Sequence, residues 1–166
     1  MSTEKFETSL EAGKHKELNA FAGKWEGITK TWFEPGVLAD ESPARGTIKS
    51  VLDGRFIMYE YQGSLSGKPF EGVAIFGYSV SHQKYQCAWV DSFHMGTAIM
   101  FSTGKDAGGK VSVLGAYGAG AGSDEAEWGW RTEMELKENE LIVTAYNISP
   151  TGEEAKAVET VYRRVG

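Results

Sequence analysis

The most constraining feature of this sequence is a series of strand-like segments joined by very short connections. Runs rich in β-branched and aromatic residues recur along the chain, and most of them are separated by about two to five residues. Parallel neighbours would need crossovers of a dozen or more residues, so the spacing predicts antiparallel pairing. The expected strands cover about residues 24–33, 44–52, 55–62, 70–79, 85–91, 97–103, 110–117, 128–137, 140–149 and 155–165.

About ten antiparallel strands are expected to close into an up-and-down β-barrel, because closure removes exposed strand edges. Barrels of about eight strands fill their interior or hold one small ligand, so ten strands should leave a cavity unless large side chains fill it. A length of 166 residues predicts a single domain spanning residues 1–166. Residues 1–12 are polar and acidic, and we expect them to be flexible.

A short helix at about residues 13–22 is expected to precede the first strand and to cap one end of the barrel. Leu18, Phe21 and Ala22 recur at helical spacing and form an apolar face. Gly23 is placed to end this helix in a left-handed turn. From Trp25 onward the hydrophobic period changes to two, which is typical of a strand with one buried face.

Composition excludes several classes of function. The net charge is −6 and the Lys and Arg residues are scattered, whereas nucleic-acid binding requires a basic stripe. No apolar run reaches about 18 residues, so no membrane span is expected, and the first residues lack the apolar region of a secretory signal. The single cysteine, Cys87, excludes an internal disulfide and favours a reducing compartment. A cytoplasmic location is therefore expected.

The predicted inward faces mix aromatic and polar residues, as a binding cavity requires. Inward aromatic and apolar positions are expected at Trp25, Phe33, Phe56, Met58, Phe70, Phe76, Tyr85, Trp89, Ile99, Phe101, Trp130 and Met134. The same faces carry Thr29, Thr31, Glu60, Tyr78, Asp91 and Tyr117. The alternative is that these polar groups bond to one another beneath a filled core.

An ordered series of motifs resembles one known family. The series begins with the helix-to-strand motif His15-x-x-Leu18-x-x-Phe21-Ala22-Gly23-x-Trp25-x-Gly27 and continues with Leu52-x-Gly54-Arg55-Phe56 and Glu60-Tyr61-x-Gly63. Phe70-x-Gly72, Gly77-Tyr78, Lys84-Tyr85 and Trp89-x-Asp91-Ser92 follow. In these motifs the chain resembles the uncharacterised bacterial family called domain of unknown function fifteen-seventy-nine. The resemblance implies a calycin-like, that is lipocalin-like, barrel and implies no activity.

Asp91 and His94 are the candidate catalytic residues, because a carboxylate and a histidine near the barrel rim can form an acid–base pair. The alternative is that Asp91 binds backbone N–H groups, Arg55 or Arg131 and orders the turn. A metal site would need about three convergent ligands, and we expect none. No cofactor is expected either: haem ligation, by analogy with nitrobindin-like barrels, would need a histidine late in the chain, and none follows His94.

We therefore expect a β-barrel that binds a small apolar or amphipathic molecule and is not an enzyme. The predicted ligand-binding residues are Trp25, Arg55, Phe56, Phe76, Tyr78, Trp89, Asp91 and Trp130, with Arg55 and Asp91 as the polar anchor. One alternative is an enzyme that uses Asp91 and His94 at the barrel mouth. Another is a scaffold that forms homo-oligomers through an outer face carrying Trp32, Trp128 and Trp130, because Trp is enriched at interfaces.

Overall fold

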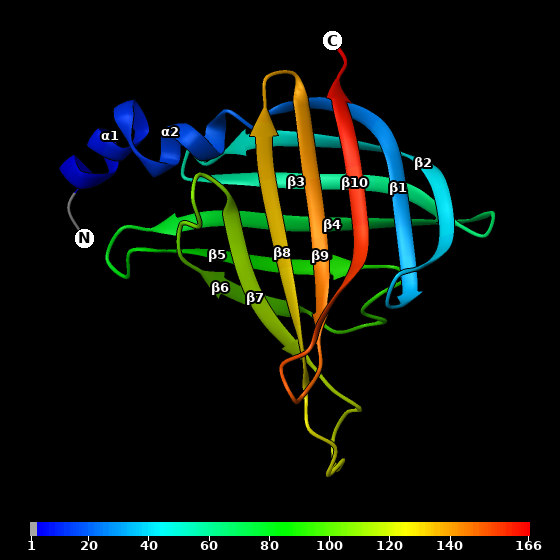
Figure 1. Ribbon diagram of the computed structural model, residues 1–166. Coiled ribbons are helices and arrows are strands. Elements are labelled where there is room, and N and C mark those ends of the chain that lie inside the picture. Colours follow the sequence, from blue (N-terminus) through cyan, green and yellow to red (C-terminus); the bar gives the residue numbers. More distant parts are fainter. Residues whose placement is uncertain (1–2) are drawn as a thin grey trace.

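The computed structural model describes residues 3–166 as a closed barrel of ten antiparallel strands preceded by two short helices (Figure 1). The helices are α1 (Thr3–Ala12) and α2 (Lys14–Asn19). The strands are β1 (Gly23–Glu34), β2 (Val37–Val51), β3 (Phe56–Leu65), β4 (Lys68–Ser79), β5 (Lys84–Asp91), β6 (Met100–Gly104), β7 (Val111–Tyr117), β8 (Trp128–Lys137), β9 (Glu140–Ile148) and β10 (Glu154–Arg164). Each strand pairs with its neighbour in sequence, and β1 pairs with β10 to close the ring. The predicted up-and-down barrel is confirmed.

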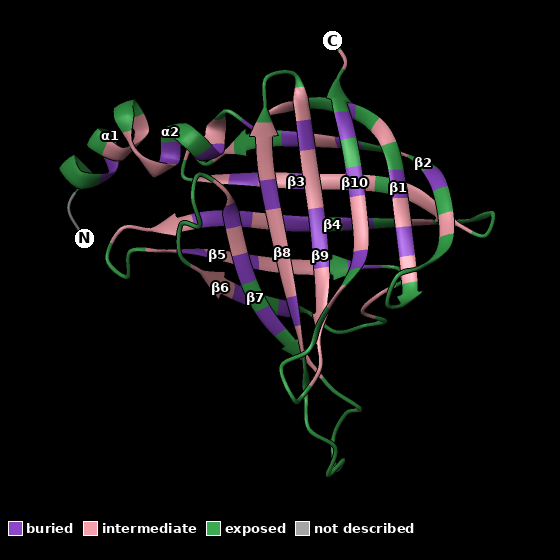
Figure 2. Ribbon diagram, viewed as in Figure 1, coloured by how far each residue is buried: buried purple, intermediate pink, exposed green. Residues whose placement is uncertain are grey.

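Buried and exposed residues alternate along the strands, as Figure 2 shows. On β1 the side chains of Trp25, Thr29 and Thr31 are buried. On β5 the buried positions are Tyr85, Cys87 and Asp91. The predicted inward faces of these two strands are therefore largely confirmed, and β4 and β8 follow their predicted alternation as well.

The predicted inward face is wrong for β3. Phe56, Met58 and Glu60 are the residues predicted to face inward, whereas Ile57 and Tyr59 are the buried residues. Ile57 lies opposite Phe76 on β4, and directly opposite residues share a face, so the inward face of β4 fixes that of β3. A shift of one residue exchanges the two faces of a strand.

The same error occurs at β6 and at the far end of β1. Ile99 and Phe101 are 70% and 61% exposed, because Met100 and Ser102 are the residues opposite inward-facing positions of β5. Phe33 is 64% exposed. The pairing of β1 with β2 shifts register between Thr31 and Glu34, and this irregularity turns the end of β1 away from the interior.

The second strand begins earlier than predicted, at Val37, and includes Pro43. Pro43 lies opposite Ile28 of β1, while pairing with β3 begins only at Arg45. The edge of β2 that faces β3 is therefore unpaired at Pro43, and a proline, which lacks an N–H group, is tolerated at an unpaired edge. The β1–β2 hairpin extends beyond the part of β2 that pairs with β3.

The N-terminal segment is helical rather than flexible over residues 3–12, which corrects the prediction for residues 1–12; residues 1 and 2 lie outside the described part of the chain. Phe6 of α1 is buried, and its ring meets that of His15 edge-on at 5.0 Å between centroids. The guanidinium of Arg55 lies 4.4 Å from the centre of the Phe6 ring. These contacts hold α1 against the end of the barrel.

The second helix closes one end of the barrel. Leu18 and Phe21 belong to the core, and the indole N–H of Trp25 donates a hydrogen bond of 3.0 Å to the Phe21 carbonyl oxygen. Gly23 does not form the predicted left-handed helix cap: it begins β1 with φ +153°, and a Cβ atom there would collide with the guanidinium of Arg164. The glycine therefore provides room for Arg164, which covers the Trp25 ring at 4.3 Å.

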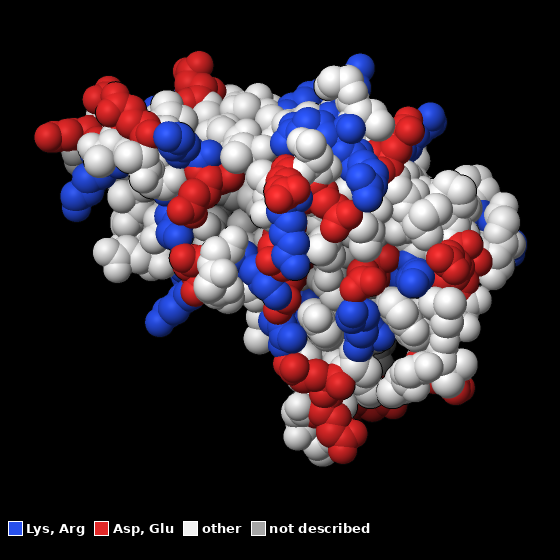
Figure 3. Space-filling view, turned by 45° about the horizontal axis from the view of Figure 1, so that its top comes forward, with Lys and Arg blue, Asp and Glu red and all other residues white. Residues whose placement is uncertain are grey.

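The surface carries both charges. Figure 3 shows Lys and Arg interspersed with Asp and Glu over the visible face, with no continuous basic area there. Within residues 3–166, no helix has the length and apolar character needed to span a membrane.

Candidate ligand-binding cavity

The barrel contains an internal cavity with a volume of about 90 Å³. Aromatic side chains form much of its wall, among them Phe70, Phe76, Trp89, Phe93, His94 and Trp130. Small or hydroxyl-bearing side chains leave the space open, among them Thr29, Ala74, Ser102, Ala145 and Thr160. The cavity is therefore largely apolar, with hydroxyl groups distributed around it.

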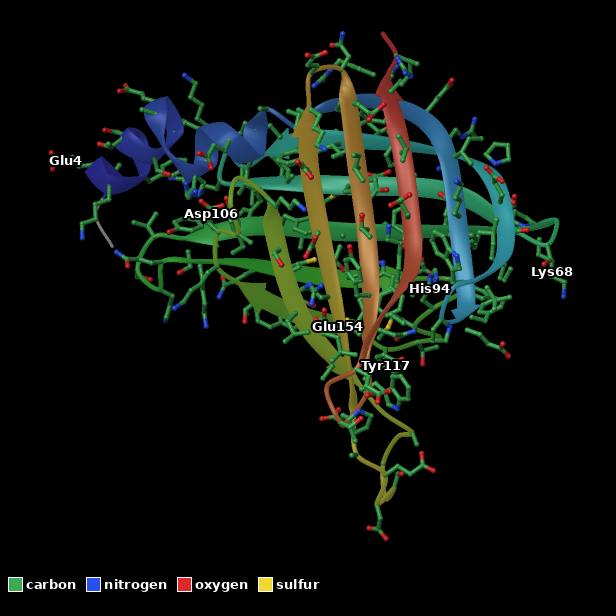
Figure 4. All side chains as sticks on the ribbon, in the orientation of Figure 1. Glu4, Lys68, His94, Asp106, Tyr117 and Glu154 are labelled. Carbon is green, nitrogen blue, oxygen red and sulfur yellow. The ribbon has the colours of Figure 1, made fainter. Side chains whose placement is uncertain are left out.

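The cavity lies toward the end of the barrel opposite the helices. The segment between β5 and β6 crosses this end, and it carries Phe93 and His94. Figure 4 labels His94 on the side of the barrel away from α1 and α2. The ring of His94 lies 5.9 Å from that of Trp130 and 5.8 Å from that of Phe70. His94 thus lies within the aromatic wall at the mouth of the cavity.

Two pairs of hydroxyl groups on the inner surface of the barrel join different strands. The hydroxyls of Thr29 and Thr160 lie 2.6 Å apart and join β1 to β10. Those of Tyr59 and Tyr162 are also 2.6 Å apart. Burial raises the pKa of Tyr162 to about 12 and that of Tyr59 well above its ordinary value, so both phenols stay protonated and uncharged.

A hydrogen-bonded network of five residues supports the mouth of the cavity. The indole N–H of Trp89 donates to the Tyr61 hydroxyl oxygen at 2.7 Å, and the Tyr61 hydroxyl donates to Oδ2 of Asp91. The other oxygen of Asp91, Oδ1, accepts hydrogen bonds from the backbone N–H groups of Phe93 and His94, at 2.5 and 2.7 Å. Asp91 therefore orders the start of the segment that carries His94.

The imidazole of His94 also faces Asp91. Its Nδ1 atom lies 3.2 Å from Oδ2 of Asp91, in an orientation that does not give a well-aligned hydrogen bond. Burial alone would raise the pKa of Asp91, but the contact with His94 and the hydrogen bonds from Tyr61 and the backbone outweigh it, and the pKa of Asp91 lies below its ordinary value. The Asp91 side chain is thus an ionised carboxylate with no exposed surface.

The structure brings only some of the predicted ligand-binding residues to the cavity. Phe76, Trp89 and Trp130 line it, and Asp91 lies behind its wall. Trp25 and Tyr78 close the helical end instead: Trp25 packs beneath Arg164, and Tyr78 contacts the rings of His15 and Tyr85.

Two predicted residues lie away from the cavity. Phe56 is on the outer face of β3, where its ring covers Gly77. Arg55 is exposed at the helical end and contacts Phe6 of α1. Arg55 therefore does not form a polar anchor with Asp91, and the carboxylate of Asp91 is held by backbone N–H groups, Tyr61 and His94 instead.

Sequence reasoning missed the tyrosines of β3 and β10 that line the cavity, Tyr59, Tyr61 and Tyr162. The signal for Tyr59 and Tyr61 was present, because they alternate with Glu60 and Gln62 and thus form the less charged face of their strand. Phe93, from the segment that also carries the predicted His94, forms part of the wall and was not predicted.

Cys87 also lines the cavity and is buried. Burial raises the pKa of its thiol to about 12, so the reactive thiolate is scarce at neutral pH. Among residues 3–166, no three side chains of His, Cys, Asp or Glu converge in a way that could hold a metal ion.

The three tryptophans expected on an outer face are separated. Trp130 is buried in the cavity wall, whereas Trp128 is 42% exposed at the start of β8. Trp32 is half-buried on β1, with the Lys156 ammonium 5.9 Å from its ring centre. These residues do not form a single stripe.

The fold and the cavity define the chain as a ten-stranded antiparallel β-barrel with a mostly apolar interior. The sequence profile of the family described as "Protein of unknown function (DUF1579)" matches residues 11–164. The chain belongs to this family. No curated protein matches the sequence at a significant level.

A solved structure with a similar fold is the one described as "Crystal Structure of Rv2717c from M. tuberculosis". The match covers 95% of this chain and 98% of that chain, with a TM-score of 0.60 and 13% sequence identity. At this identity the similarity concerns the fold alone.

Proposed function

We propose that this protein binds a small, largely apolar molecule inside its barrel. The observation that carries the proposal is the internal cavity itself, whose walls combine aromatic side chains with a few hydroxyl groups and one histidine. Such a combination is typical of small-molecule sites, where apolar surface supplies affinity and a few polar groups supply orientation.

The arrangement of the wall supports this function over that of a filled structural core. Ala74 and Ala145 are buried on the inner faces of β4 and β9, where larger residues would fill the space. The rings of Trp89 and Trp130 are stacked with an angle of 15° between their planes, and the Tyr61 hydroxyl holds the indole of Trp89. The wall is thus held in place by its own contacts and leaves the cavity preformed, which lowers the entropic cost of binding.

The test of this function fills the cavity with a larger side chain through the substitution Ala74→Leu. Isothermal titration calorimetry with toluene, a probe of shape and apolarity only, should detect binding to the natural protein and none to Ala74→Leu. The matched control is Ala116→Leu, which enlarges an exposed alanine on the outer face of β7. Circular dichroism establishes that each variant is folded. Equal binding by both variants, or no binding by the natural protein, would overturn the proposal.

A second candidate function is proton transfer to a bound ligand. One contact favours it: the 3.2 Å separation of His94 Nδ1 from Asp91 Oδ2, which allows the ionised Asp91 to orient the imidazole toward a bound ligand. The test uses acetophenone, whose methyl protons are exchangeable, in heavy water. NMR should show faster deuterium uptake with the natural protein than in buffer, and the buffer rate with His94→Gln. Uptake at the buffer rate in both samples would exclude this function.

A further inference from the structure

The charges around the cavity restrict the chemistry of its ligand. Among residues 3–166, no Lys, Arg, Asp or Glu side chain lines the cavity. Arg55 lies at the helical end, and Arg131 is paired with Glu133 and Glu154 on the outer surface. An anionic group bound inside would therefore be removed from water without a cationic partner, which carries a large energetic cost.

The carboxylate of Asp91 is a fixed charge in contact with two lining residues, Tyr61 and His94, and both of its oxygens are engaged. Oδ1 accepts two backbone hydrogen bonds, and Oδ2 accepts from Tyr61 and contacts His94. Its negative charge disfavours an anion in the neighbouring cavity. A cationic ligand cannot reach its oxygens either, because Tyr61 and His94 cover them. The interior therefore suits an uncharged molecule.

His94 is the polar group placed to recognise such a molecule. Its Nδ1 faces Asp91, so the other ring nitrogen, Nε2, is directed away from Asp91, and the His94 side chain lines the cavity. The Tyr61 hydroxyl already donates to Asp91 and accepts from Trp89. The Thr29 and Thr160 hydroxyls bond to each other. Thr31, Ser102 and Thr132 also line the cavity, but His94 lies at its mouth, where one ring nitrogen is placed to bond a hydroxyl or carbonyl group of an entering ligand.

The size and shape of the cavity limit the size of the ligand. Its volume of about 90 Å³ is well below the range of about 300–1,000 Å³ that holds drug-sized ligands. A dry cavity of roughly 150 Å³ accommodates benzene, so one ring is the upper size limit here, and a bound ring would extend from the cavity into its open mouth beside His94. The walls are flat rings, so the space suits a single ring and excludes an extended fatty-acyl chain.

We infer that the ligand is an uncharged, single-ring compound whose one hydroxyl or carbonyl group hydrogen-bonds to Nε2 of His94 at the mouth of the barrel. The inference rests on the proposed ligand-binding function and adds to it the charge, the size and the polar contact of the ligand.

The test compares four probes that share one ring: toluene, p-cresol, 4-methylbenzoate and 4-methylbenzylammonium. Calorimetric titrations at about pH 8 keep p-cresol neutral, the carboxylate ionised and the amine protonated. The variants are His94→Phe, which keeps a ring and removes the polar nitrogens, and His94→Gln. The control is His82→Phe, at the exposed β4–β5 turn where His82 bonds only to Ser79 and Ser81.

We expect p-cresol to bind at least tenfold more tightly than either charged probe. His94→Phe should weaken p-cresol binding by about fivefold, to the level of toluene, the loss expected for one hydrogen bond. Toluene binding should be unchanged in His94→Phe, and His82→Phe should match the natural protein with every probe. His94→Gln should retain part of the preference for p-cresol over toluene, because its amide can still form a hydrogen bond.

Two results would overturn the inference while leaving ligand binding intact. One is a charged probe that binds as tightly as p-cresol, and the other is a preference for p-cresol over toluene that His94→Phe does not change. Absence of binding by all four probes to the folded natural protein would instead contradict the proposed function, and the inference would fail with it.

Discussion

The hydroxyl groups of Tyr59 on β3 and Tyr162 on β10 lie 2.6 Å apart inside the barrel, between strands that are not neighbours in the sheet. Their rings meet edge-on at 6.3 Å between centroids. Both phenols are buried and uncharged, and their hydrogen bond connects two strands that are separated in the ring by β1 and β2.

Removal of one hydroxyl from this pair should destabilise the protein. In Tyr162→Phe the buried hydroxyl of Tyr59 loses its partner, and an unsatisfied buried polar group costs about 1–3 kcal/mol. Urea unfolding should show a lower free energy of unfolding by this amount. The double variant Tyr59→Phe/Tyr162→Phe should lose less than the sum of the two single variants, because it leaves no orphaned hydroxyl. Additive losses would show that the two groups do not interact.

Gly27 should tolerate no side chain. A Cβ atom at this position would overlap the carbonyl oxygen of Val161, because β1 and β10 approach closely where the barrel closes. Gly27→Ala should therefore lower the free energy of unfolding by about 1–3 kcal/mol or more. Gly118→Ala is the control, since its Cβ would approach the flexible side chain of Glu127 at 3.2 Å and the Glu127 backbone at an ordinary contact distance of 3.9 Å. Equal stability of the two variants would contradict the close approach.

Asp91 should make the stability depend on pH in the acid range. Its pKa is lower in the folded protein than in the unfolded chain, so the unfolded chain binds more protons between the two values. The stabilisation is complete above the unfolded-state pKa of about 3.9 and is lost as the pH falls through the folded-state pKa. The free energy of unfolding should fall less steeply with acid in Asp91→Asn than in Asp124→Asn, an exposed control. Parallel curves would contradict the contribution of Asp91.

Cys87 should resist thiol reagents in the native protein. Its thiol is buried, and its pKa of about 12 leaves little thiolate at neutral pH. A disulfide reagent should modify the urea-unfolded chain rapidly and the native protein only at the rate of barrel opening. Rapid modification of the native protein would mean that the cavity wall around Cys87 opens readily to solvent.

The fold was predictable from the sequence because the short connections permit few alternatives to an antiparallel meander. The inward faces of β1, β4, β5 and β8 followed from their alternation. Both faces of β3 and of β6 carry apolar residues, so the alternation of residue types does not show which face is turned inward. The inward face is determined by the register of β3 with β4 and of β6 with β5.

The candidate site was only partly predictable for a related reason. Buried and exposed residues alternate clearly on β5 and β8, which carry Trp89 and Trp130. The contact between Asp91 and His94 lies at the end of β5. Arg55 lies at the helical end of the barrel, where its guanidinium contacts Phe6 of α1. The mostly polar sequence of α1 did not predict that Phe6 packs against the barrel. The cavity size also depends on packing across the barrel, which no local pattern encodes.

The central claim, that a ligand occupies the interior of the barrel, is tested most directly by NMR of the tryptophan indole N–H groups during titration with p-cresol. Trp89 and Trp130 line the cavity, whereas Trp32 and Trp128 lie outside it and Trp25 closes the helical end. We predict that the signals of Trp89 and Trp130 shift and saturate together while the other three remain in place. Shifts confined to Trp32 or Trp128, or no shift at all, would contradict binding inside the barrel.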